Sequence, residues 1–176
     1  KGGYGGVPGV NHPVATPAEA AAEVDAQATK GADFIKLWVD DELHTMPEMA
    51  ADMSKAIIDA AHRHGLKAYA HVFYLDDAKR LTAQGVDGFV HTVRDQPVDQ
   101  ALIDAMKAMG TVQIASTLSR EAAVMAFGQP APELKDPFFQ QSISPTALAM
   151  LASPERQKTI AAQPSYPRLP AFLAAA

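Results

Sequence analysis

Three nitrogen-bearing side chains lie near the ends of three short apolar stretches of the chain. Lys36 belongs to GADFIKLWV, His71 to KAYAHV and His91 to DGFVHTV. Imidazole nitrogens are common zinc ligands, so two histidines brought together are typical of a metal site. Because the chain contains no cysteine, a metal must be held by histidine, carboxylate or a less usual ligand. These three residues are therefore candidate metal ligands.

Lys36 is the unusual member of this set, because an ammonium group has no lone pair to offer a metal. Burial beside divalent cations favours the neutral amine, which can add carbon dioxide to form a carbamate. The two oxygens of a carbamate can bridge two metal ions. Two simpler interpretations stay open. A strand histidine is commonly a hydrogen-bonded core residue, and a lysine near a strand end commonly extends its amine to solvent or pairs with a carboxylate such as Asp40 or Asp41.

The sequence contains four strand patterns. The first three contain Lys36, His71 and His91, and the fourth comes after them. They span residues 31–39, 67–72, 87–93 and 111–118, and each begins at or just after a glycine suited to ending a helix. Helical patterns lie between them, and a capping-box start predicts a further helix from Thr16 to about Lys30. Strand–helix alternation with short connections predicts a parallel sheet, whose strands end at a common edge where α/β folds bind ligands.

Side-chain alternation along each strand predicts that the three candidate ligands share one face of the sheet. The predicted residues on that face are Phe34, Lys36 and Trp38 in the first strand, Tyr69 and His71 in the second, and Phe89 and His91 in the third. We therefore expect an amine and two imidazoles at one edge.

The stretches GADFIKLWVDD, AIIDAAHRHGLKAYAHVFYLDDAKRL and GVDGFVHTVRD resemble the metal-dependent amidohydrolase superfamily, and within it the imidazolonepropionase-like and prolidase-like branch. The resemblance covers residues 16–118 and implies a (β/α)8 barrel of which these stretches are middle strands. It implies that Lys36 is the carboxylated lysine of strand four, which bridges two divalent metal ions, with zinc the expected metal. It implies that His71 and His91, on strands five and six, are ligands of the second metal.

Two parts of that family's metal site have no counterpart in the sequence. The family's first strand carries a His-x-His pair, and its eighth strand carries a metal-binding Asp. The nearest substitute, His62 with His64, falls in the last turn of a predicted helix, where histidines interact favourably with the helix dipole. Four strands are also too few to close an eight-stranded barrel. The expected fold is therefore an α/β partial (β/α)8 TIM barrel, about strands four to seven with their helices.

The chain is expected to have three regions. Residues 1–15 form a loop, and residues 16–118 form a half-barrel of βα units. Residues 119–176 form a long, proline-containing and partly helical excursion toward a missing eighth strand. Exposed strand edges in such a fragment favour association, so a homo-oligomer is expected.

The expected function is that of a fragment of a binuclear metal-dependent hydrolase that cleaves C–N bonds in an amide, dipeptide or cyclic amide. The fragment alone is expected to be inactive. Tyr74 lies just after His71 and is a candidate donor to the developing oxyanion, and Arg94 lies just after His91 and is a candidate clamp for a substrate carboxylate. The competing roles are packing for Tyr74 and a solvated salt bridge in a loop for Arg94.

Two alternatives compete with this function. One is a non-catalytic half-barrel that retains the site residues. The other is a complete doubly wound α/β domain that binds a small molecule without catalysis. The doubly wound domain predicts a sheet whose strand order reverses, whereas a barrel fragment predicts that each strand lies beside the next one in sequence.

Composition narrows the classes of partner. The chain has 176 residues, of which 48% are hydrophobic and 20% are charged, so a packed core is expected. A net charge of −5 argues against binding to nucleic acid or to an anionic membrane. No apolar run approaches the roughly 20 residues that a membrane span needs. A soluble protein with a small-molecule substrate is expected, whether cytoplasmic or exported.

Overall fold

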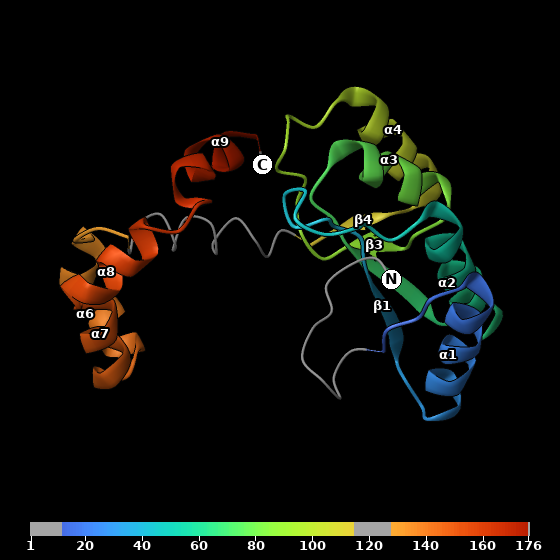
Figure 1. The fold of residues 1–176 in the computed structure, drawn as a ribbon, viewed down its shortest axis with the longest axis horizontal. Helices are drawn as coiled ribbons and strands as arrows, with labels where there is room; N and C mark the ends of the chain where they lie inside the picture. Colours follow the sequence, from blue (N-terminus) through green and yellow to red (C-terminus); the bar gives the residue numbers. More distant parts are fainter. Residues whose placement is uncertain (1–11, 115–127, 176) are drawn as a thin grey trace. The chain divides into compact units, whose positions relative to one another are not determined.

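The computed structural model describes residues 12–114 and 128–175 (Figure 1). The chain divides into two compact units, one of residues 1–116 with Ala176 and the other of residues 117–175. The strands of the described residues all lie in the first unit, and the second unit is helical where it is described. Each unit is considered by itself below.

The first unit contains a parallel sheet whose strand order in space follows the sequence. Among the described residues its strands are β1 (Phe34–Trp38), β2 (Lys67–His71), β3 (Gly88–Phe89) and β4 (Val112–Gln113), in the order β1-β2-β3-β4. The predicted parallel sheet is confirmed. The sequential order is the one expected of a barrel segment, and the order of the described strands does not reverse as that of a doubly wound domain would.

Helices precede and connect the strands, as the apolar patterns predict. They are α1 (Pro17–Thr29), α2 (Ala51–Arg63), α3 (Leu75–Ala83) and α4 (Gln100–Met109). The start of α1 shows why the boundaries fall where they do. The Thr16 side chain accepts a hydrogen bond from the Glu19 N–H, and Glu19 in turn accepts one from the Ala15 N–H. The first bond satisfies an amide that the first helical turn leaves without a partner, and the second ties the residue before the cap to the helix.

One face of the sheet packs against the helices, and the other face carries the polar candidates. Ile35, Leu37, Ala68 and Ala70 are buried in the core shared with the helices. The residues between them in sequence therefore lie on the opposite face. Register aligns Lys36 with Tyr69 and Trp38 with His71, so neighbouring strands place these side chains side by side.

The predicted alternation is wrong for the third strand. Phe89 pairs in register with Ala70 and is only 1% exposed in the helix-side core, so it does not share the face of Lys36. The strand ends at Phe89, and the chain bends at Val90 and His91. Successive side chains alternate between the two faces of a sheet only where the backbone is extended. The position of the His91 side chain therefore depends on the bend and not on this alternation. The fourth strand is also shorter than predicted, and residues 115–118 of that prediction lie outside the described residues.

Gly88 lets β3 approach β4 closely on the face away from the core. A Cβ added there would lie 2.7 Å from Cγ2 of Val112, 2.9 Å from its carbonyl oxygen and 3.0 Å from Cδ1 of Tyr69. We expect Gly88→Ala to lower the free energy of unfolding by about 1–3 kcal/mol, because backbone atoms must shift to accept the methyl group. Urea denaturation of the two proteins measures this difference. Equal midpoints would contradict the close approach.

The second unit is a run of short helices. They are η1 (Pro132–Lys135), α6 (Pro137–Ser142), α7 (Pro145–Ala152), α8 (Pro154–Ala161), η2 (Tyr166–Arg168) and α9 (Leu169–Ala175). The three α-helices from α6 to α8 each begin with proline. The side chain of the residue before each proline accepts a hydrogen bond from a backbone N–H in the first turn of the helix; these capping residues are Asp136, Ser144 and Ser153. Proline suits a first helical position, which accounts for the proline content of this region. In the described parts of the chain, no helix has both the length and the apolar character to cross a membrane.

Candidate metal centre at the carboxyl end of the sheet

Lys36 lies in the middle of β1 on the face away from the helices. Its Nζ is 5.2 Å from the centre of the Trp38 ring and donates a hydrogen bond to the Leu37 carbonyl oxygen at 3.3 Å. The side chain still reaches solvent, yet the protein atoms around it displace enough water to lower its pKa to about 8. Its amine is therefore neutral far more often than that of an ordinary lysine.

The carboxylates considered as partners of Lys36 are used elsewhere. Asp40 pairs with His71, and Asp41 pairs with His44 and accepts a hydrogen bond from Tyr74. The interpretation of Lys36 as half of an ion pair with Asp40 or Asp41 is therefore wrong. The reason is that both carboxylates follow the end of β1, where they meet the residues that follow β2.

His71 ends β2 and is held on two sides. Its ring stacks on Trp38, with centroids 3.8 Å apart and planes inclined by 6°. Its Nε2 lies 2.6 Å from Oδ2 of Asp40. The residue is 3% exposed, and its Nδ1 is buried with no hydrogen-bond partner among the described residues. A hydrogen-bonded core histidine accounts for the bond to Asp40 and leaves Nδ1 unexplained.

The charge state of His71 follows from its surroundings. Burial lowers its pKa, and the positive charges of Lys36 and Arg94 act in the same direction. The bond to Asp40 and the charge of that carboxylate oppose the shift without reversing it. The imidazole is therefore neutral at neutral pH, which is the form that binds metals.

His91 reaches the same place from the bend that follows β3. Its ring centroid lies 4.6 Å from that of His71, with the ring planes at 72°. The Gln113 side chain of β4 donates to the His91 carbonyl oxygen at 3.0 Å, which ties the bend to the next strand. The structure thus brings the rings of His71 and His91 together. Lys36 lies on the face of the sheet that carries His71, and the Trp38 ring contacts both Lys36 and His71.

Tyr74 lies at the junction between β2 and α3. Its hydroxyl donates to Oδ1 of Asp41 at 2.6 Å, and its ring stacks against His44 with centroids 5.6 Å apart. Burial raises the pKa of Asp41, but the hydrogen bonds from Tyr74 and from His44 outweigh burial and hold that pKa below its ordinary value. The phenol therefore faces a charged acceptor from the loop after β1.

Arg94 is buried rather than exposed in a loop. It is 3% exposed, and its guanidinium carbon lies 5.0 Å from the centre of the Phe73 ring. Its backbone N–H donates to the Phe73 carbonyl oxygen at 2.9 Å, which joins the segments that follow β2 and β3. Its positive charge acts to lower the pKa of His71.

The remaining histidines lie in ion pairs outside this group. His62 pairs with Asp87, His64 with Asp25 and His12 with Glu23, at 2.7–2.9 Å. His62 and His64 flank the end of α2, as expected for residues that do not replace the family's His-x-His pair.

The donors present make a partial metal shell. The described residues contain no group of three or more His, Cys, Asp or Glu side chains able to hold a metal ion. A carbamate on the Lys36 amine would add two oxygen ligands to the two imidazoles. The buried Nδ1 of His71 fits a metal site, since a bound cation would give that nitrogen a partner.

Sequence reasoning did not find the roles of Trp38 and Asp40. Both are in or next to the segment that carries Lys36, and both contact His71. Strand register pairs Trp38 with His71. Register cannot be read from two separated stretches of sequence, so this contact could not be predicted.

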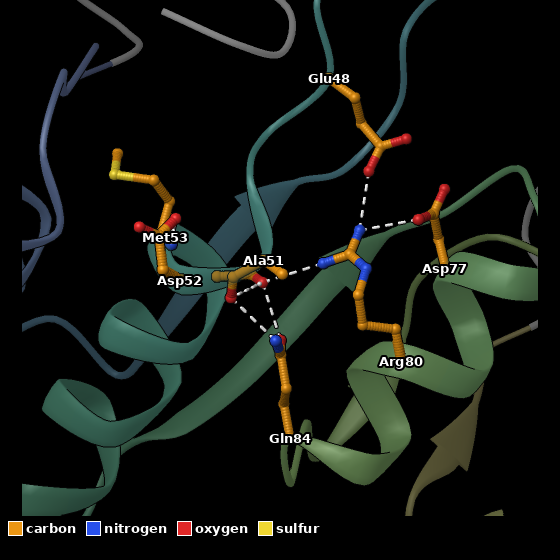
Figure 2. A network of polar contacts seen from close by, with 8 residues as sticks. Glu48, Ala51, Asp52, Met53, Asp77, Arg80 and Gln84 are labelled. Atoms are coloured by element: carbon orange, nitrogen blue, oxygen red, sulfur yellow. Dashed lines mark hydrogen bonds and ion pairs between the residues drawn. The ribbon is translucent and has the colours of Figure 1, made fainter.

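A second polar network joins the loop before α2 to α3 (Figure 2). Arg80 Nη2 lies 2.7 Å from carboxylate oxygens of both Glu48 and Asp77, and Nη1 donates to the Ser54 hydroxyl. Ser54 and Gln84 complete the network through the Ala51 carbonyl oxygen. Burial raises the pKa of Glu48 to about 7, and the charge of Asp77 adds to the effect, while Arg80 opposes it.

Comparison with solved structures defines the class of fold. An amidohydrolase matches 94% of this chain over 35% of its own, with a TM-score of 0.60 and 16% sequence identity. A prolidase complexed with N-methylphosphonate-L-proline matches 89% of this chain over 36% of its own, with a TM-score of 0.56 and 20% identity. The chain is thus an α/β segment with the fold of the amidohydrolase superfamily, and the predicted resemblance is confirmed at the level of the fold.

The matched structures also include a dipeptidase. A Xaa-Pro dipeptidase with methionine bound in its active site matches 89% of this chain over 38% of its own, with a TM-score of 0.54 and 22% identity. No protein-family model matches the chain. Uncharacterised proteins of Mycobacterium bovis and Mycobacterium tuberculosis are 36% identical to it over 74 residues. The chain spans 20% of the length of these relatives and 35–38% of the three solved structures.

Proposed function

We propose that this chain is the part of a binuclear metal-dependent hydrolase that supplies strands four to seven of its barrel. The parallel, sequential sheet supports this proposal. So do large apolar side chains that stay exposed in the first unit, among them Phe34 at 53%, Val112 at 50% and Ile114 at 46%. The interior of a complete barrel is filled by side chains from all its strands, so a segment of one leaves such residues uncovered.

One observation carries the proposed metal site. His71 and His91 have their rings 4.6 Å apart, and the buried Nδ1 of His71 has no hydrogen-bond partner among the described residues. A neutral imidazole with an unused lone pair, next to a second imidazole, is suited to a cation such as zinc. We assign His71 and His91 as ligands of one of two divalent metal ions.

Lys36 supplies the bridging ligand in this proposal. Its neutral amine attacks carbon dioxide, an N–C bond forms as one C–O π bond opens, and a proton leaves to solvent, so that the product is a carbamate whose single negative charge is shared by two oxygens. The lowered pKa of Lys36 favours the amine that this step needs. When bound, two divalent cations supply a water of lowered pKa and polarise the carbonyl group of the substrate.

Tyr74 and Arg94 would bind the substrate. We propose that the Tyr74 hydroxyl group donates a hydrogen bond to the oxyanion that develops on the carbonyl oxygen. The substrate would then replace Asp41 as the acceptor of this hydrogen bond. Arg94 would hold a carboxylate, because a guanidinium offers paired donors in a matching geometry. Amides that carry a carboxylate, such as dipeptides and N-acyl amino acids, are then the preferred class of C–N substrate, with cyclic amides the other candidate.

Metal content tests the proposed site. We expect the full-length protein, purified with added zinc, to bind about two equivalents, and the Lys36→Ala/His71→Ala double variant to bind fewer than half of that amount. The reason is that the variant lacks both the bridging group and a terminal ligand. Mass spectrometric metal analysis after desalting makes the measurement. His62→Ala/His64→Ala is the matched control, because those histidines lie in ion pairs outside the site. Unchanged zinc in the Lys36/His71 variant would refute the site.

Hydrolytic activity is the second test of the proposed function and uses the same purified proteins. Hydrolysis of dipeptides and N-acyl amino acids by the full-length protein should depend on the added metal. The 176-residue chain alone is proposed to have no turnover, because its sequence lacks the family's first-strand His-x-His pair and eighth-strand Asp. Hydrolysis by the isolated chain would contradict that part of the proposal.

A further inference from the structure

Asp40 and His71 form a buried, hydrogen-bonded pair at the carboxyl ends of β1 and β2. Their side chains are 7% and 3% exposed, and Oδ2 of Asp40 lies 2.6 Å from Nε2 of His71. An ionised carboxylate can only accept hydrogen bonds, so the partners assign the imidazole proton to Nε2. The other ring nitrogen, Nδ1, then carries the lone pair, and it is the atom that is buried without a hydrogen-bond partner among the described residues.

Both members of the pair are fixed in orientation. The second oxygen of Asp40, Oδ1, accepts the Glu42 N–H at 2.8 Å, so the carboxylate cannot rotate without losing one of its two bonds. The His71 ring is stacked flat against Trp38, which fixes its plane. The imidazole therefore has one tautomer and one orientation before any ligand arrives.

We propose that Asp40 is a positioning residue that holds His71 in the Nε2–H tautomer and leaves Nδ1 as the atom that binds a divalent cation. This inference rests on the proposed function in taking His71 as a metal ligand, and it adds the binding atom and the residue that selects it. A carboxylate behind a metal-binding histidine fixes its tautomer and makes the ligating nitrogen more basic.

Asp40→Asn is the variant that tests this role while keeping the shape of the side chain. The single carbonyl oxygen of Asn must take the Glu42 N–H, because the amide NH2 group cannot accept it. The NH2 group then faces Nε2 of His71 and can only donate. Nε2 must accept, so the imidazole proton moves to Nδ1, and that nitrogen loses the lone pair that a cation needs.

The tautomer is measured directly in the metal-free, full-length protein. Two-dimensional NMR of a sample labelled with 15N-histidine distinguishes protonated from unprotonated ring nitrogens, and His71→Gln assigns the signals. We expect Nε2–H in the parent protein and Nδ1–H in Asp40→Asn. Asp41→Asn is the matched control, since that carboxylate lies in the same loop but binds Tyr74 and His44, and it should keep the parent tautomer. An Nε2–H tautomer in Asp40→Asn, or an Nδ1–H tautomer in the parent, would overturn the inference.

Metal affinity gives the second readout. We expect Asp40→Asn to weaken zinc binding about 10–100-fold, measured by competition with a chromophoric chelator, and Asp41→Asn to change it far less. Equal losses in the two variants would overturn the positioning role. If the parent protein binds no zinc at Lys36, His71 and His91, the proposed function fails, and the binding atom assigned here fails with it. The NMR result then decides the tautomer assignment by itself.

Discussion

In the metal-free protein, Lys36 is expected to react with an amine-directed reagent such as acetic anhydride with a midpoint near pH 8. Its pKa is lowered from 10.5 to about 8 by burial, so the neutral amine, which is the reactive form, is about 300-fold more abundant at pH 7 than in an ordinary lysine. The sign follows from the cation: burial disfavours the charged form, and reactivity rises as the pH rises through the pKa. Trace labelling followed by peptide mass spectrometry yields the pH profile.

Lys67 is the internal reference in the same digest. It is exposed, and its hydrogen bond to Asp87, together with the charge of that carboxylate, raises its pKa above the ordinary value. Its labelling should therefore begin at a higher pH than that of Lys36. Superimposable profiles for the two lysines would show that the surroundings of Lys36 do not favour its neutral amine. Carbamate formation at Lys36 would then lose its main physical support.

Glu48 is expected to make the protein less stable as the pH rises from about 4.5 to about 7. Burial, with the nearby charge of Asp77, raises its pKa from 4.5 to about 7, so the folded state holds a proton that the unfolded state releases. This contribution to stability is complete below pH 4.5 and is lost as the pH passes through 7.

Glu48→Gln removes that pH dependence, because the amide keeps a neutral hydrogen-bonding group at every pH. The measurement is the difference in unfolding free energy between parent and variant, from urea denaturation at intervals between pH 4.5 and pH 8. The difference should move in favour of the variant as the pH rises. A flat difference over this pH range for Glu48→Gln would mean that the Glu48 carboxyl group titrates at its ordinary pKa.

The network of Figure 2 explains why this carboxyl group can hold a proton without disrupting the fold. Arg80 is shared between Glu48 and Asp77, so one guanidinium faces two carboxylates. Asp41 adds a further negative charge nearby. A single positive charge cannot compensate all three, and protonation of the most strongly perturbed carboxylate relieves the repulsion.

Predictions from local patterns succeeded where the cause is local. The capping residues of α1 depend on contacts within a few positions, and the parallel sheet follows from repeated alternation of strands and helices. The same reasoning placed Lys36 and His71 on one face, because β1 and β2 are extended over five residues each. It failed for Phe89, because β3 has only two residues and the backbone then bends.

The amino-acid sequence by itself determined the order of helices and strands, since that order depends on residue type and short-range periodicity. It also singled out the three candidate ligands, and the resemblance of its motifs to a known superfamily indicated the class of fold. The tertiary structure alone decided their partners. Asp40 bonds to His71 across 31 positions, and Asp41 bonds to Tyr74 across 33. Such contacts depend on strand register and on the path of the loops after each strand, which arise from packing of the whole sheet against its helices. The tautomer of His71, the lowered pKa of Lys36 and the raised pKa of Glu48 all follow from that packing.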